Sequence, residues 1–141
     1  MWAWLAIQMM WGVAMAEPPA EPSPIAVSFH GDRGPSISIR ATGDAVALPA
    51  CRGVSWERWD LDSEQFVLLP QQSCGPMSPA ILVDQQGREV AAPDGLGLTA
   101  GDRVRVHVVV GLGCELTRPM PLEVAGCARI LQVLGALGEV K

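Results

Sequence analysis

Turn-forming residues divide this chain into short apolar runs, and this limits the folds open to it more than any other feature. Glycine occurs 15 times and proline 12 times among the 141 residues. Glycine stands beside aspartate, proline or glutamine at 31–35, 42–44, 85–87 and 100–102, which is typical of turns. No run before the C-terminus sustains the 3.6-residue apolar period of a helix. The pattern therefore predicts short β-strands joined by turns.

Ten strands are expected from the apolar runs. They span 25–30, 36–41, 45–48, 54–60, 65–69, 80–84, 88–92, 103–110, 122–125 and 128–134. In the runs 36–41 and 103–110, apolar and polar residues alternate, which is expected when one face of a strand meets a core and the other meets water.

The last run is ambiguous. Ile130, Leu134 and Leu137 fit one face of a helix, whereas Gly135 and Gly138 weaken a helix at this place. We expect a strand that ends at Leu134 and a frayed tail after it.

Many short strands in a chain with four cysteines predict an all-β fold, an immunoglobulin-like β-sandwich of antiparallel strands. A β-barrel is the alternative. The segment 96–106, a turn that leads into a long alternating strand, resembles a hairpin common in bacterial extracytoplasmic β-sandwiches. That resemblance implies an architecture and no particular function.

The first sixteen residues have the character of a signal peptide. They contain no charged side chain, and the small residues Ala14 and Ala16 meet the rule for a cleavage site before Glu17. The basic residues that usually begin such a leader are missing. The alternatives to a signal peptide are a short membrane anchor and a buried N-terminal element. We expect a signal peptide at 1–16, a proline-rich spacer at 17–24 and one β-sandwich domain at 25–141.

This organisation places the mature chain outside the cytoplasm, in the periplasm or secreted. It predicts no stable membrane span after cleavage, because the apolar leader is shorter than the roughly 20 residues that a spanning helix needs. Cys51, Cys74, Cys114 and Cys127 all follow the expected cleavage site, and an even number of cysteines in an exported chain favours disulfides. Of the three possible pairings, the sequence-local one is preferred: Cys51 with Cys74 and Cys114 with Cys127.

The charge of the chain argues against nucleic acid as a partner. Fifteen acidic and ten basic side chains give a formal net charge of -5, and the arginines are scattered singly. Phosphate binding needs clustered basic side chains, so no nucleic-acid partner is expected.

No motif for catalysis, for a cofactor or for a metal stands out. His30, Asp32 and His107 would have to meet in space to hold a metal, and Met77 or Met120 would have to join a histidine to hold copper. The acidic run 60–64 has oxygen-bearing residues at alternate positions but lacks the glycine of a calcium loop, so we expect a hairpin turn there. No catalytic residue, metal ligand or cofactor is assigned.

Two tryptophans within the first cysteine loop are the strongest candidates for a contact surface. Trp56 and Trp59 have opposite parity on a strand, so one should face the core and the other should face outward. With Arg58 they form the expected contact with a protein or glycan partner, and packing of both tryptophans in the core is the alternative. The function that we expect is that of an exported non-catalytic interaction or structural module. A small inhibitor or ligand-binding domain comes second, and an enzyme or metal-binding protein third.

Overall fold

A computed structural model of the chain describes residues 22–32, 34–74 and 78–141. The expected signal peptide at 1–16, most of the expected spacer at 17–24 and Met77 lie outside the described residues. Within the described ranges, no helix is long and apolar enough to cross a membrane.

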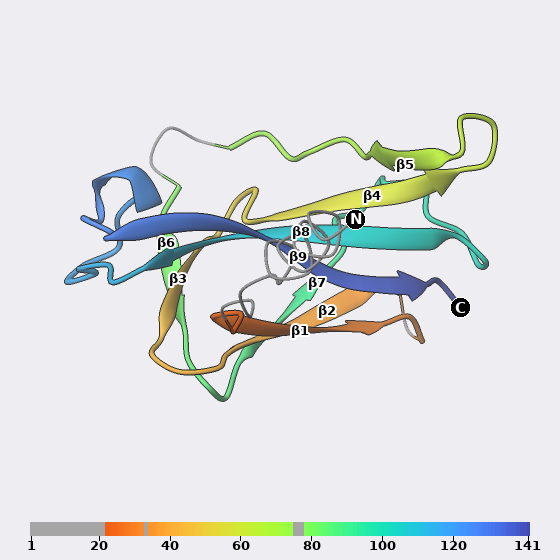
Figure 1. The fold of residues 1–141 in the computed structure, drawn as a ribbon. Helices are drawn as coiled ribbons and strands as arrows, with labels where there is room; N and C mark the ends of the chain where they lie inside the picture. The colour runs from red at the N-terminus through yellow and green to blue at the C-terminus, as the bar shows by residue number, and fades with distance from the viewer. Residues whose placement is uncertain (1–21, 33, 75–77) are drawn as a thin grey trace, which may run out of the picture.

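The described residues form an all-β fold (Figure 1). Its nine strands are Ile25–His30 (β1), Ser36–Ala41 (β2), Val46–Pro49 (β3), Val54–Asp60 (β4), Gln65–Leu68 (β5), Ala80–Val83 (β6), Arg88–Ala91 (β7), Arg103–Leu112 (β8) and Arg129–Glu139 (β9). One short 3-10 helix, Leu122–Val124 (η1), is the only helical element in this part of the chain.

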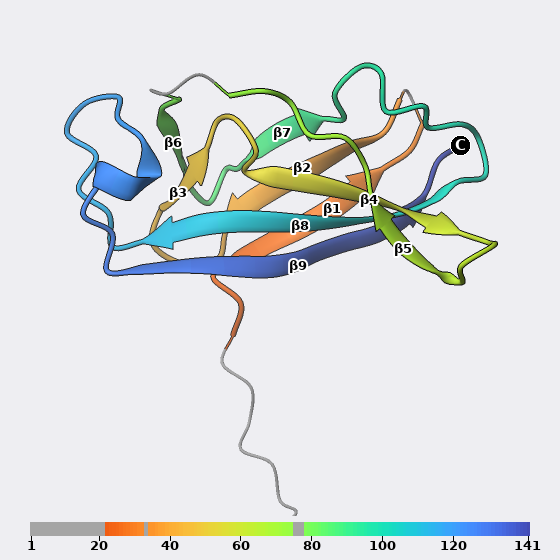
Figure 2. The ribbon, with the colours of Figure 1, turned by 90° about the horizontal axis from the view of Figure 1, so that it is seen from above.

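The strands are arranged in two antiparallel sheets, a small one of order β1-β2-β7 and a large one built on β8. One edge of β8 pairs with β9 along its whole length. The other edge is shared: Val104 to Val108 pair with β4, and Gly111 pairs with Ala47 of β3. β5 then extends the sheet beyond β4, and β6 extends it beyond β3. Figure 2 shows the long β8 and β9 lying over the strands of the small sheet.

The core lies between the two sheets. The inward residues of β8 are valines at 104, 106, 108 and 110, and all four are fully buried. Val106, Val108 and Val110 form one cluster with Ile37 and Ile39 of β2 and with Trp56 of β4. The alternation seen in the sequence of these strands thus separates a buried face from an outward face.

The prediction of a strand at 122–125 is wrong, because the chain forms the 3-10 helix η1 there. This segment lies within a loop that the Cys114–Cys127 disulfide closes after 13 residues. Gly126, at φ +61°, turns the backbone directly after it, so no extended run is available for pairing.

The expected end of the last strand at Leu134 is also wrong, because β9 continues to Glu139. Arg105 pairs with Leu137 and His107 with Leu134, so two residues of β9, Gly135 and Ala136, lie opposite Val106. This β-bulge adds one residue to the strand. Even-numbered residues of β9 therefore face outward before the bulge, and odd-numbered residues face outward after it.

Glycines in the second half of β9 allow the two sheets to meet closely at one side. β1 and β9 run side by side there (Figure 2). A Cβ atom at Gly138 would overlap the ring of Phe29. One at Gly135 would lie 2.9 Å from a methyl group of Val106 in β8 and 3.3 Å from a methyl group of Val27. The glycines that weaken a helix are therefore the residues that make room for side chains of β1 and β8.

We expect Gly138→Ala to lower the free energy of unfolding by about 1 to 3 kcal/mol, because the new methyl group overpacks the contact with Phe29. Urea unfolding of the disulfide-intact chain measures this. Gly43→Ala is the matched control, since no atom lies within 4 Å of the added group. The combination of Gly138→Ala with Phe29→Leu should cost less than the sum of the two single changes. Additive costs would contradict the overlap.

Candidate functional site

The outward face of the large sheet carries a polar network and a group of aromatic contacts. It is formed by alternate residues of β4, β8 and β9, which lie in rows across the sheet because the strands are in register. One row contains Ser55, His107 and Leu134, and the next contains Glu57, Arg105 and Leu137.

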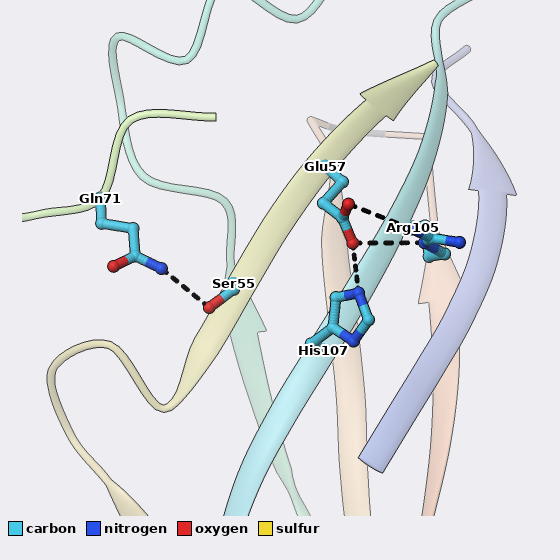
Figure 3. A network of polar contacts seen from close by, with 5 residues as sticks. All are labelled: Ser55, Glu57, Gln71, Arg105 and His107. Atoms are coloured by element: carbon cyan, nitrogen blue, oxygen red, sulfur yellow. Dashed lines mark hydrogen bonds and ion pairs between the residues drawn. The ribbon is translucent and has the colours of Figure 1, made fainter. Parts of the chain in front are cut away.

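Glu57 is the centre of a network on this face (Figure 3). Its carboxylate accepts hydrogen bonds from Nε of Arg105 at 3.2 Å and from Nη2 of the same side chain at 3.1 Å. Nε2 of His107 contacts the carboxylate as well. Beside this group, the Gln71 amide donates to the hydroxyl of Ser55 at 3.0 Å. The network ties β4 to β8 and anchors the chain that follows β5.

The ionisation of Glu57 is favoured by its partners. The Glu57 residue is buried, with 8 % of its surface exposed. The hydrogen bonds from Arg105 lower the pKa of the Glu57 carboxyl; burial opposes this effect, and His107 lowers the pKa further. A carboxylate held ionised in a bidentate pair suits a fixed link between strands better than proton transfer, which works best with a pKa near the working pH.

The structure separates the three residues expected to form one contact surface. Trp56 lies in the core with 4 % of its surface exposed. Nη1 of Arg58 reaches the backbone oxygen of Gly97, at 3.4 Å. Trp59 alone is on the outward face, in agreement with its parity.

Trp59 is already engaged within the chain. Its ring meets the ring of Phe66 edge to face, with centroids 5.2 Å apart. The guanidinium of Arg103 lies over the Trp59 ring, 5.5 Å from its centroid. Trp59 is half-buried between these neighbours, so its ring is part of the packing of the outward face.

The cysteines form two disulfides, Cys51 with Cys74 and Cys114 with Cys127, which is the sequence-local pairing. The first joins the turn before β4 to the chain after β5. The second closes the loop between β8 and β9. Both disulfides therefore fasten connections at the ends of the large-sheet strands.

His30 and His107 lie on different sheets and have different partners. His30 shares a 2.8 Å hydrogen bond with Ser38 across the small sheet, whereas His107 contacts Glu57. Among the residues that the structure describes, no three His, Cys, Asp or Glu side chains are grouped so that they could hold a metal ion.

The acidic run 60–64 is a hairpin turn, as expected, because Trp59 pairs with Phe66 on either side of it. The hydroxyl of Ser63 donates to the Asp60 carboxylate at 2.7 Å. This hydrogen bond lowers the pKa of Asp60. The oxygens of Asp60 thus stabilise the turn itself.

A cavity of about 650 Å³ lies at the end of the small sheet. It is lined by His30 and Ser36, by the carboxylates of Glu89 and Asp94, and by the loop that follows β7. The described lining carries more acidic than basic side chains. A small ligand-binding domain, the second function expected from the sequence, would use this cavity.

An apolar stripe on β9 is the feature that sequence reasoning missed. Ile130, Leu134 and Leu137 are 53 %, 59 % and 62 % exposed. They share the outward face of one strand, because the bulge between Leu134 and Leu137 adds one residue and restores their common side. The signal was present in the sequence as the spacing of these three residues, but that spacing is also the spacing of a helix face.

We expect Glu57→Gln to lower the free energy of unfolding by about 1 to 3 kcal/mol, because the charge-assisted hydrogen bonds from Arg105 lose their acceptor charge. Urea unfolding at neutral pH measures the change. Glu89→Gln, on the exposed surface of β7, is the control and should stay within about 0.5 kcal/mol of the original chain. Equal effects of the two changes would show that the network adds no stability.

Stability should also depend on pH through Glu57. The pKa of Glu57 in the folded chain lies below its ordinary value. The network therefore stabilises the fold fully at pH values above the ordinary pKa. This stabilisation is lost as the pH falls through the lowered pKa. Thermal unfolding at a series of acidic pH values should show a smaller loss of stability for Glu57→Gln than for the original chain. Parallel pH profiles would contradict the lowered pKa.

Comparisons with protein-family models, with curated protein sequences and with solved structures gave no significant match to this chain. Its function is therefore inferred from the arrangement of its own residues.

Proposed function

We propose that this chain is an exported, non-catalytic protein-interaction domain that contacts its partner through the outward face of β9. The observation that carries this proposal is the stripe of Ile130, Leu134 and Leu137, each more than half exposed on one side of one strand. Large aliphatic side chains that share a surface mark contact sites in soluble proteins, because the free energy of the system falls when apolar surface is removed from water.

Two features support export. The apolar leader at 1–16 ends at Ala14 and Ala16, as a cleavable signal peptide does. The two disulfides are consistent with an oxidising compartment outside the cytoplasm.

We assign the fold to the immunoglobulin-like β-sandwiches. Short antiparallel strands in two sheets, with a core between them, support this assignment. Such a sandwich presents the outer faces of its sheets to solvent, where polar residues are usual. Aliphatic side chains on that face of β9 therefore require a reason, and contact with another protein supplies one.

A protein partner fits the stripe better than a glycan or a small molecule. Small ligands bind in concave cavities that enclose most of their surface. Leu134 and Leu137 line none of the cavities described, and Ile130 borders only the one beside Leu122 and Glu123. The Trp59 ring that would stack on a sugar already contacts Phe66 and Arg103. An open strand face instead suits the broad contact of another protein.

Site-specific photocrosslinking tests this surface. We expect p-benzoylphenylalanine in place of Leu137 to give a discrete crosslinked protein product in cells that export the chain, because the partner covers this position. The matched control is the same replacement of Leu82, which is 56 % exposed on β6 and lies outside the stripe.

Mass spectrometry of the products identifies the captured protein. A product at position 137 that is absent at position 82 supports the proposal. Equal capture at both positions, or no capture at 137, would refute the role of the stripe.

A further inference from the structure

We infer that the partner of the β9 stripe is a second copy of this chain, bound antiparallel across a two-fold axis that passes between Leu134 and Leu137. This inference rests on the proposed function and names the partner of the same surface. It is carried by the order of the outward side chains along β9 and by their chemistry.

Five residues of β9 occupy its outward positions. They lie opposite the β8 residues 111, 109, 107, 105 and 103, in that order, and are Ile130, Gln132, Leu134, Leu137 and Glu139. Neighbouring positions in this series are about 7 Å apart, since they lie opposite residues that are two apart along β8. The series therefore places two leucines side by side, with a polar residue on each flank.

This order is complementary to itself when reversed. An antiparallel second copy places Leu134 against Leu137 of the other chain, and places Gln132 against Glu139. The amide group of Gln132 donates hydrogen bonds, and the carboxylate of Glu139 accepts them, so each flank forms a matched polar pair. Among the described residues neither side chain has another hydrogen-bond partner, so both are available.

The bulge directs contact to the face of β9 and away from its edge. An exposed strand edge can pair with the edge of another chain, and a bulge disrupts the regular ladder that such pairing needs. The bulge lies within β9, opposite Val106, and β1 lies beside the same edge. Two copies therefore meet face to face, with the four leucines in the centre.

The size of the stripe sets the strength of the association. Stable protein interfaces bury about 1,200 to 2,000 Å² in total, and five side chains from each chain cover less than this. A two-fold contact of this kind closes at two copies, so it produces dimers and no filaments. We expect a reversible dimer whose population rises with concentration.

Sedimentation equilibrium of the processed, disulfide-intact protein tests the inference over concentrations up to about 1 mM, where weak dimers are detectable. The chain should follow a monomer–dimer equilibrium. Leu134→Asp should weaken dimerisation at least about tenfold, because a leucine buried at the centre is replaced by a charge. Leu82→Asp, equally exposed on β6, should leave it unchanged. Thermal unfolding checks that each variant is folded.

A charge exchange tests the antiparallel arrangement itself. Gln132→Glu places two carboxylates opposite each other at both flanks and should weaken dimerisation. Adding Glu139→Gln to that variant restores an amide opposite a carboxylate, with the roles reversed, and should recover it. Failure of the second change to recover dimerisation would overturn the antiparallel pairing.

The outcomes separate this inference from the proposed function. A chain that stays monomeric at every concentration, or a dimer that Leu134→Asp does not affect, overturns the second copy as partner. If the photoreactive group at position 137 then captures a different protein, the proposed function stands. If that group captures nothing, the proposed function fails as well.

Discussion

The two-sided character of β8 is the constraint on which the rest of the structure depends. Its valines at 104, 106, 108 and 110 are fully buried between the sheets, and the residues between them face outward. β8 also supplies the backbone partners of β9, β4 and β3. A shift of one residue in its register would exchange the valines with Arg103, Arg105 and His107, and would place charged groups in the core. The position of every other strand in the large sheet follows from this strand.

The outward face of β8 then decides how the neighbouring strands are joined. Arg105 meets Glu57 of β4 through two hydrogen bonds, and His107 meets the same carboxylate. Arg103 lies over Trp59. On the β9 side the outward neighbours of Arg105 and His107 are leucines. Over β4 and β8 the outward side chains of the large sheet contact one another, whereas β9 exposes three large aliphatic side chains. For this reason β9 is the part that favours an external partner.

Several elements could be predicted from local pattern alone because the physical signal is itself local. Alternation in β2 and β8, turn residues around 42–44 and 85–87, and the hairpin turn at 60–64 all depend on residues near one another in the sequence. The 3-10 helix at Leu122–Val124 and the length of β9 could not be predicted in this way. The first depends on a loop that a disulfide closes, and the second depends on Val27 and Phe29, which lie more than one hundred residues away.

The amino-acid sequence by itself determined the all-β class, the alternating strands and the opposite sides of Trp56 and Trp59, because side chains change faces at every residue of a strand. Only the tertiary structure decided the Glu57 network, since its members come from strands that are distant in sequence. The same is true of the stripe. Ile130, Leu134 and Leu137 have the spacing of a helix face, and they share one side of a strand only because the bulge in β9 adds a residue between the last two.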